Sequence, residues 1–258
     1  MVAMDLGIDP AEMRLKNLLT PDELPYDIGE LVPGDRGIKM EKGDFPSGLK
    51  QVLDAIDYNH WKDRQGELVD GKLIGLGLGC FTESSAAGPP ETARVTVAPD
   101  GAVEVRVGAS TVGQRVETGK AQICGDVLSV SCDRITLLHG PPTVLEDGGG
   151  TFASRNTVMA GNALLLAVET LIDQCIELAA LRWNQAVDDL AYDNGGVCNK
   201  ETNAFMSIAE LAGYAETRND SDRLSADGKW DNQGKVAYSS GAHACLLALD
   251  PELSLIHI

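Results

Sequence analysis

The segment that decides the fold is ARVTVAPDGAVEVRV, residues 93–107, in which apolar and polar residues alternate on both sides of a central turn. Alternation with a period of two is typical of strands that bury one face. Asp100-Gly101 lies between the two alternating runs and favours a tight hairpin turn. The segment therefore predicts an antiparallel pair of strands, Arg94–Val97 and Val103–Val107.

Helical patterns lie on both sides of this hairpin. Asp9-Pro10 is typical of a helix start, and this helix should end before Thr20-Pro21. The apolar spacing predicts further helices over Phe45 to Tyr58, from about Glu117 to Leu128 and from about Asn156 to Trp183. The last of these is rich in Ala, Leu, Val and Ile and is expected to be mostly buried.

More strands and a shorter helix complete the pattern. A short strand is predicted through Ile135–Leu138, a strand-turn-strand in VDDLAYDNGGVCN (187–199) and a closing strand in KVAYSSGAHACLLALDPE (235–252). SIAELAGYAE (207–216) predicts a helix capped by Ser207. Because strands and helices are mixed without a regular βαβ period, the predicted fold class is α+β.

Composition limits the kind of protein this can be. The 258 residues carry a net charge of −18, from 39 acidic and 21 basic side chains. This balance argues against a protein that tracks nucleic-acid phosphates or binds anionic membranes. No run approaches the roughly 18 apolar residues of a membrane span, and no secretory signal is visible, so a soluble cytoplasmic protein is expected.

Cysteine and histidine give little support to a metal held by side chains. The six cysteines include no C-x-x-C pair, and the four histidines include no close pair. The cysteines are better explained as small buried apolar residues. No metal-ligating residue is therefore predicted.

A glycine-rich segment, GLGLGC at residues 75–80, invites comparison with dinucleotide-binding loops. It lacks the third glycine at the spacing that such loops need. A strand packed closely against neighbouring backbone is the favoured interpretation.

Two other segments are unlike ordinary core. In TVGQRVET (111–118) a strand gives way to a helix, and Gln114 can both donate and accept hydrogen bonds. In GGGTFASRNT (148–157) a glycine run is followed by hydroxyl groups at the mouth of the long helix. Helix starts present unpaired N–H groups, so both segments are candidates for binding an anionic or oxo-bearing ligand. For each of them, a plain turn without a ligand is the alternative.

At these residues the sequence resembles a known family. The motifs are GPPETARVTVAPDGAVEVRVGASTVGQ (88–114), TGKAQ (118–122) and GTFASRNTVMAGNA (150–163). They look like the molybdopterin-binding large subunit of the molybdenum hydroxylases, the family of xanthine dehydrogenase, aldehyde oxidase and aerobic CO dehydrogenase. LGIDPAEMRLKNL (6–18) and SGAHACLLALDPE (240–252) also match, so the resemblance covers nearly the whole chain in order.

The resemblance implies a molybdenum cofactor whose pterin dithiolene carries the metal, with no side-chain ligand. In the family a Gly-Gln turn approaches this cofactor, and a Thr-x-x-Ser segment forms a second wall along it. The resemblance thus assigns cofactor binding to seven residues of the two candidate segments: Gly113, Gln114, Thr151, Phe152, Ala153, Ser154 and Arg155.

The resemblance also implies how the chain is organised. Residues 1–70 would be the end of a first molybdopterin-binding module with a linker, and residues 71–258 the N-terminal part of a second module. The chain would then be an internal fragment of a longer subunit. [2Fe-2S] and FAD would lie in partner subunits or domains, and the complete assembly would be a homodimer. The pterin either carries a cytosine nucleotide or lacks it.

The family hydroxylates a carbon of an aldehyde, purine or N-heterocycle, with water as the oxygen source and a glutamate as base. That glutamate belongs to a motif expected beyond Ile258, so no catalytic residue is predicted here and the fragment alone should be inactive. Glu83 and Glu91 match early-strand positions of the family pattern, and neither is predicted to be catalytic.

Two departures from the family pattern favour a second hypothesis. Arg115 occupies a position where glycine is usual, and Pro141-Pro142 stands where a carboxylate is usual. The alternative is a non-catalytic binding or scaffold relative that retains the fold.

Overall fold

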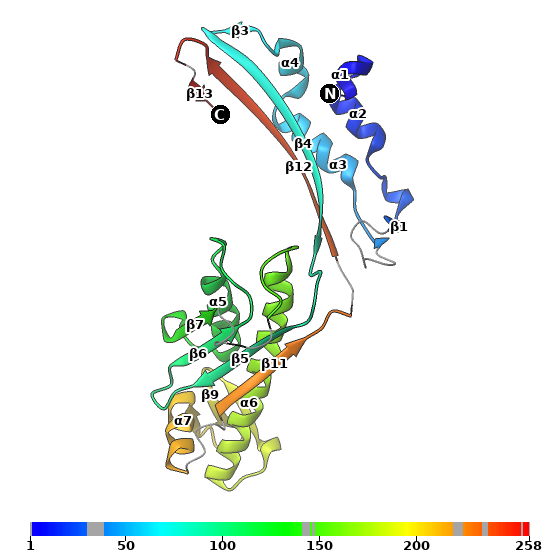
Figure 1. The fold of residues 1–258 in the computed structure, drawn as a ribbon. Coiled ribbons are helices and arrows are strands. Elements are labelled where there is room, and N and C mark those ends of the chain that lie inside the picture. Colours follow the sequence, from blue (N-terminus) through cyan, green and yellow to red (C-terminus); the bar gives the residue numbers. More distant parts are fainter. Residues whose placement is uncertain are drawn as a thin grey trace. The chain divides into compact units, whose positions relative to one another are not determined.

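The computed structural model describes residues 2–29, 39–140, 145, 148–218, 224–233, 237–253 and 255–257. The chain divides into two compact units. The first consists of residues 1–84 and 237–258, and the second of residues 85–236 (Figure 1). The module boundary expected at residues 70 and 71 concerns the longer family subunit and stays a prediction.

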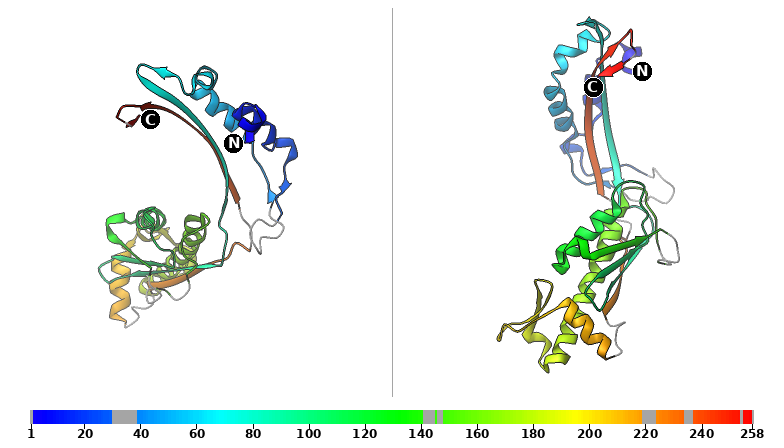
Figure 2. Two further views of the ribbon diagram at one scale, coloured as in Figure 1. Left: turned by 45° about the horizontal axis from the view of Figure 1, so that its top comes forward. Right: turned by 90° about the vertical axis from the view of Figure 1, so that its left-hand side faces the viewer.

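The first unit is built on two long strands, β4 (Lys72–Ser85) and β12 (Ala237–Asp250), which lie side by side. The short strands β3 (Leu68–Val69) and β13 (Leu255–His257) extend this sheet in the order β13-β12-β4-β3. The helices α1 (Val2–Leu6), α2 (Pro10–Asn17), α3 (Phe45–Ala55) and α4 (Tyr58–Trp61) lie along one face of it (Figures 1 and 2). A separate pair, β1 (Tyr26–Asp27) and β2 (Lys39–Met40), is antiparallel.

Asp9 starts α2 as its pattern predicts and also joins α2 to α4. Its Oδ1 accepts from the backbone N–H of Ala11 at 2.7 Å and from the Tyr58 hydroxyl at 2.9 Å, and its Oδ2 accepts from Lys62 Nζ at 3.2 Å. Burial alone would raise the pKa of Asp9, but these hydrogen bonds outweigh it and lower the pKa. Burial and the bond to Asp9 raise the pKa of Tyr58 to about 12.

The second unit contains a four-stranded sheet in the order β11-β5-β6-β7. Its strands are β5 (Glu91–Val97), β6 (Val103–Val107), β7 (Ile135–His139) and β11 (Ser225–Trp230). The hairpin prediction is confirmed, because β5 and β6 are antiparallel with Val97 opposite Val103. β6 and β7 are parallel and are connected through α5 (Val116–Leu128).

The long helix α6 (Gly161–Trp183) packs with α5 against this sheet and contributes more buried residues to the core than any other element that the structure describes. Alternate residues of β5 and β6, including Val95 and Val105, point into the same core. At β11 the sheet comes so close to α6 that a Cβ on Gly228 would lie 2.0 Å from the Ala163 carbonyl oxygen. Glycine at this position is therefore required by the packing.

A smaller sheet and one helix complete the second unit. The order is β10-β9-β8, with β8 (Leu190–Asp193), β9 (Gly196–Asn199) and β10 (Phe205–Ser207). α7 (Ile208–Thr217) follows, and Ser207 and Glu210 form its capping box. Both the strand-turn-strand and the capped helix agree with the sequence patterns. Single 3-10 turns occupy Pro21–Glu23, Lys62–Arg64, Cys132–Arg134 and Val187–Asp189.

The α+β class is confirmed, and two helix predictions need adjustment. The helix expected over Phe45 to Tyr58 is divided, because Asp57 adopts a left-handed backbone with φ of 52° between α3 and α4. The helix expected from Asn156 begins with a π-helical turn, Asn156–Ala160, before α6. The glycine-rich segment lies inside the continuous strand β4, so it does not form a dinucleotide-binding turn.

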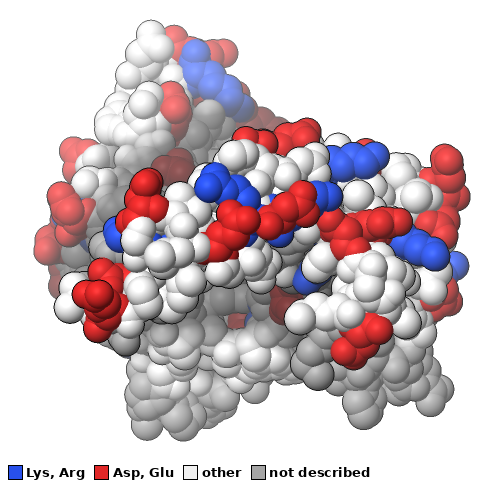
Figure 3. Space-filling view, turned by 90° about the horizontal axis from the view of Figure 1, so that it is seen from above, with Lys and Arg blue, Asp and Glu red and all other residues white. Residues whose placement is uncertain are grey.

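The surface carries mixed charge. On the face drawn in Figure 3, acidic side chains are interspersed with basic ones. Of the helices that the structure describes, none combines the length and the apolar character needed to cross a membrane.

Candidate functional site

The fold brings the two predicted ligand segments together. The first lies between β6 and α5, and the second lies between β7 and the π-helical turn. The Thr151 hydroxyl joins them: it donates to the Ser110 carbonyl oxygen and accepts from the Ser110 N–H at 3.1 Å. A Cβ on Gly148 would lie 2.5 Å from the Gly108 Cα, so the backbone at the start of the second segment lies directly against the chain two residues before Ser110. We call Ser110–Arg115 the first loop and Gly148–Arg155 the second loop.

The first loop is an exposed turn that is braced by Gln114. The Gln114 Oε1 accepts from the Val112 N–H at 2.6 Å, and its Nε2 donates to the Ser110 carbonyl oxygen at 3.3 Å. Gly113 has φ of 96°, where a side chain would be strained. The backbone N–H groups of Gln114 and Arg115 donate to no other described residue. They therefore stay available to a ligand.

Arg115 occupies the usual glycine position of the family in a conformation that favours glycine. Its φ is 61° and its ψ is 47°, directly before the first residue of α5. Its side chain is exposed. The backbone at this position thus has the left-handed form in which glycine is favoured, and arginine adopts it here at some conformational cost.

The second loop offers a similar row of donors. Ala153 and Ser154 have φ of 44° and 47°, and Arg155 returns to a helical φ of −87°. When neighbouring residues change between left-handed and right-handed backbone conformations, successive N–H groups point to one side, and this favours the binding of an anion. The N–H groups of Phe152, Ala153 and Ser154 donate to no other residue in the described part of the chain. The Phe152 and Ser154 side chains are exposed, and that of Thr151 is partly buried.

The side chain of Arg155 lies beneath the rest of the second loop. It is fully buried, and its Nη1 donates to Glu91 Oε2 at 2.8 Å, where the carboxylate is 1% exposed. The same guanidinium donates to three carbonyl oxygens, those of Ala87, Pro89 and Gly150. Its observed contacts are thus to the protein interior, and its assignment to cofactor binding stays a prediction.

Glu91 completes this support from the sheet side. Its Oε1 accepts from the Gly149 N–H at 2.6 Å, so one carboxylate holds both the glycine run and Arg155. A Cβ on Gly149 would lie 2.0 Å from Arg155 Nη1. Glycine is therefore needed where the loop passes over the guanidinium. Glu91 is buried at the first position of a strand whose following buried positions are apolar, which is the sequence signal that could have identified it.

Lys120, which is 2% exposed, was not among the predicted site residues either. Its Nζ donates to the Asn156 carbonyl oxygen at 2.9 Å, at the first residue of the π-helical turn. Burial lowers the pKa of Lys120 to about 8, although the Glu91 charge opposes this shift. The signal was present in the spacing, since Lys120 shares one helix face with the buried Val116 and Cys124.

Three other sequence features are placed as follows. His139 Nε2 lies 2.8 Å from Glu117 Oε1 at the exposed start of α5. Pro141-Pro142 lies outside the described residues. Within the residues that are described, no three His, Cys, Asp or Glu side chains gather as a metal site would require.

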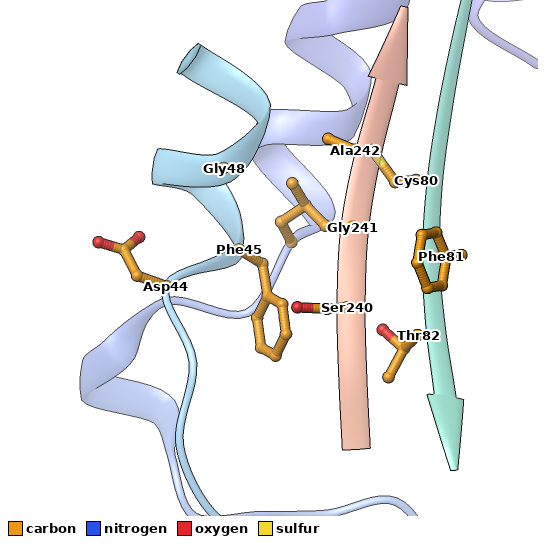
Figure 4. A pocket seen from close by; sticks show the side chains of 10 residues that line it. Asp44, Phe45, Gly48, Cys80, Phe81, Thr82, Ser240, Gly241 and Ala242 are labelled. Carbon is orange, nitrogen blue, oxygen red and sulfur yellow. The ribbon is translucent and has the colours of Figure 1, made fainter. Parts of the chain in front are cut away.

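The first unit contains a separate cavity of about 220 Å³. The start of α3, with Asp44 and Phe45, forms one side, and β4 and β12 form the other (Figure 4). Cys80 and Ser240 lie on its strand side. Its lining includes none of the predicted cofactor-binding residues.

Comparisons with known proteins agree with the motifs. The family model of the molybdopterin cofactor-binding domain matches residues 51–258. The gamma subunit of the 6-hydroxypseudooxynicotine dehydrogenase complex of Paenarthrobacter nicotinovorans is 30% identical over 96% of this chain and 32% of its own length. The carbon monoxide dehydrogenase large chain of Hydrogenophaga pseudoflava is 29% identical over 83% of this chain and 28% of its own.

The fold agrees as well. The crystal structure of the Cu,Mo-CO dehydrogenase in its CO-reduced state matches with a TM-score of 0.71 and 26% identity, covering 99% of this chain and 34% of that chain. The chain spans about a third of the length of the curated relatives named above. Because the family model covers both loops and the same fold recurs in a solved relative, this chain belongs to the molybdopterin cofactor-binding domain family of the molybdenum hydroxylase large subunits.

Proposed function

We propose that the two loops bind the pterin of a molybdenum cofactor in a complete hydroxylase subunit. The observation that carries the proposal is the hydrogen-bonded contact between Thr151 and Ser110, which brings two separately predicted segments into one surface. The seven assigned residues, Gly113, Gln114 and Thr151–Arg155, all belong to these loops. The division of the chain into two modules at residues 70 and 71 is part of the same proposal.

The residues of the loops fit such a group. A Cβ on Gly113 or Gly150 would meet nothing within 4 Å, so a flat ring could approach the backbone there. The donors are neutral N–H groups and hydroxyl groups, as the oxygen-rich and phosphate-bearing edge of a pterin requires. When bound, the cofactor supplies the molybdenum redox chemistry.

The chain's own residues would bind and orient the cofactor. The Gln114 and Arg115 N–H groups would donate from one side, and those of Phe152, Ala153 and Ser154 from the other. Arg155 and Glu91 would keep the second loop in place from beneath. No residue here is proposed as the base for substrate oxidation, which we place outside these 258 residues; the chain alone should then be inactive.

The complete protein is proposed to oxidise an aldehyde, a purine or an N-heterocycle with water as the oxygen source. Two relatives are named as a complex subunit and as a large chain. We therefore propose iron-sulfur and FAD-binding partners, a homodimeric assembly, a cytoplasmic location and a pterin with or without the cytosine nucleotide.

One observation favours a second candidate, a non-catalytic relative that keeps the fold. Arg115 adds a long cationic side chain at the turn where relatives have glycine, and its backbone is left-handed. If that side chain covers the loop, the cofactor would be excluded. Arg115→Gly should then restore cofactor binding to a complete subunit that lacks it.

The test is the molybdenum and pterin content of the complete subunit, purified with its partner subunits. Thr151→Val removes the hydroxyl that joins the loops and should lower both contents several-fold. Thr170→Val is the matched control, because the exposed Thr170 hydroxyl donates to the Leu166 carbonyl oxygen within α6 and lies in neither loop. Absence of molybdenum and pterin from the unsubstituted complex would reject the proposal.

A further inference from the structure

A buried positive charge lies behind the two loops. Among the described residues of the second unit, three charged side chains are almost completely buried, Glu91, Lys120 and Arg155. Glu91 and Arg155 form an ion pair with 2.8 Å between Oε2 and Nη1. Among the described residues, no carboxylate oxygen lies within 4.0 Å of Lys120 Nζ. The described cluster therefore carries one positive charge in excess.

Lys120 is connected to both loops through a chain of hydrogen bonds. Its Nζ donates to the Asn156 carbonyl oxygen, and the Asn156 Nδ2 donates to Thr151 Oγ1 at 3.2 Å. Thr151 in turn bonds to Ser110 of the first loop. Lys120 lies on α5, the helix that follows the first loop. These hydrogen bonds therefore link α5, the second loop and the first loop in a closed ring.

The packing around Lys120 is arranged for the ammonium group. A Cβ on Gly161 would lie 3.7 Å from its Nζ, at ordinary van der Waals distance, so the ammonium packs against the backbone at the start of α6. The bond to Asn156 also lies at the π-helical turn, where backbone carbonyls depart from regular helical pairing. The ammonium thus occupies a built position between α5 and the start of α6.

We propose that Lys120 is a positioning residue that joins the two loops and whose buried charge strengthens binding of the anionic part of the cofactor. The inference rests on the proposed function, because it needs the cofactor to lie on these loops. A charge in the interior is weakly screened, so it acts on an anion at the loop surface without touching it. Lys120 is not a catalytic residue.

pH separates this role from a purely structural one. Deprotonation of Lys120 removes its charge but leaves N–H groups that can still donate to Asn156. Several other ionisable groups face α5 or the loops. Arg155 and Glu91 form the buried ion pair beside the same loops. Burial raises the pKa of both Cys124 and Cys175 to about 12, which keeps them neutral. Glu117 and His139 face each other at the exposed helix start.

The experiment measures how fast the complete subunit, in its complex, loses pterin and molybdenum during dialysis at pH values from 7 to 10. The unsubstituted protein should lose its cofactor about ten-fold faster above pH 8 than at pH 7, which corresponds to about 1.4 kcal/mol. Lys120→Met should show the fast rate at every pH. Lys200→Met is the control, because the exposed Lys200 of the same unit also donates to a backbone carbonyl oxygen, that of Asp188, and lies in neither loop; it should keep the normal profile.

Thermal unfolding of each variant separates loss of the cofactor from loss of the fold. Lys120→Met removes a buried charge and should unfold at the same temperature as the unsubstituted protein or higher. A normal rate and a normal pH profile in Lys120→Met would overturn the inference. An unsubstituted complex that contains no cofactor at any pH would instead overturn the proposed function.

Discussion

Breaking the buried ion pair between Glu91 and Arg155 should destabilise the second unit strongly. Arg155→Met leaves the carboxylate in the interior with the Gly149 N–H as its remaining partner, and it removes the donor from three carbonyl oxygens. Removing one member of a buried pair typically costs about 3–5 kcal/mol. We expect Arg155→Met to fall within that range.

Replacing the carboxylate of the pair instead of the guanidinium should lower the free energy of unfolding by less. In Glu91→Gln the side-chain oxygen can still accept from Gly149, and Arg155 keeps its three carbonyl acceptors. The loss is then that of one charge-assisted hydrogen bond, about 2 kcal/mol. In the double variant neither member of the pair is left charged without the other, so its cost should be smaller than the sum of the single costs by at least about 1 kcal/mol.

A surface pair provides the matched control. Arg94 and Asp227 make two hydrogen bonds of 2.7 and 2.8 Å on the exposed face of the same sheet. The bond and the charge of Arg94 lower the pKa of Asp227, yet solvent screens such pairs and they contribute about 1 kcal/mol or less. Arg94→Met should therefore cost far less than Arg155→Met, although the two ion pairs have similar lengths.

The assay is urea denaturation of the full chain followed by tryptophan fluorescence. Trp183 and Trp230 pack against the core of the second unit, whereas Trp61 belongs to the first. A Trp61→Phe background thus restricts the signal to the unit that contains the pair. Equal costs for the buried and exposed arginines, or strictly additive costs for Glu91→Gln and Arg155→Met, would refute the reasoning.

Three further predictions concern the same unit. Lys120 has its pKa lowered from 10.5 to about 8, which corresponds to about 3 kcal/mol of burial cost at neutral pH. Between these pH values the unfolded chain binds more protons than the folded one. The unsubstituted protein should therefore gain stability relative to Lys120→Met as the pH rises from 8 to 10.5. Urea denaturation that gives the same stability difference at every pH would contradict this. Gly228→Ala should cost more than about 3 kcal/mol, because its Cβ would lie 2.0 Å from a carbonyl oxygen, whereas Gly77→Ala meets nothing within 4 Å and should be close to neutral in thermal unfolding. Ser207→Ala removes the side-chain cap of α7 and should lower the stability by about 1 kcal/mol in the same measurement. Ser47→Ala is the control, because α3 is capped by the side chain of Asp44 and not by that of Ser47.

Local patterns were sufficient for most of the fold. The hairpin of β5 and β6 follows from alternation and Asp100-Gly101, and α7 follows from Ser207 and the helical spacing behind it. The break between α3 and α4 was not predicted, because apolar spacing continues through Ile56 and the left-handed Asp57 leaves no mark in hydrophobicity. The pairing of β11 with β5 joins residues more than 120 positions apart, so no local signal specifies it.

The candidate site was predictable in its outline, since glycine runs and helix starts mark both loops. What supports the loops was not, because burial of a charge depends on partners that are distant in sequence. The assignment of Arg155 to cofactor binding stays a prediction, but its acceptors on residues 87–91 were not predicted. Lys120 looked like an ordinary helix residue because its acceptor is the carbonyl of Asn156, which carries no sequence signature.

The buried charges follow from one physical feature of the second unit. Two successive left-handed residues and a π-helical turn make the second loop unfavourable by itself. Such a backbone persists only if the surrounding groups fix it, and the groups that do so are an ion pair and an ammonium with 0–2% exposure. Apolar side chains could fill that volume but could not hold Gly149, Gly150 and Asn156 by hydrogen bonds. The buried charges are therefore explained by the shape of the loops, and it is the loops that the proposed cofactor would contact.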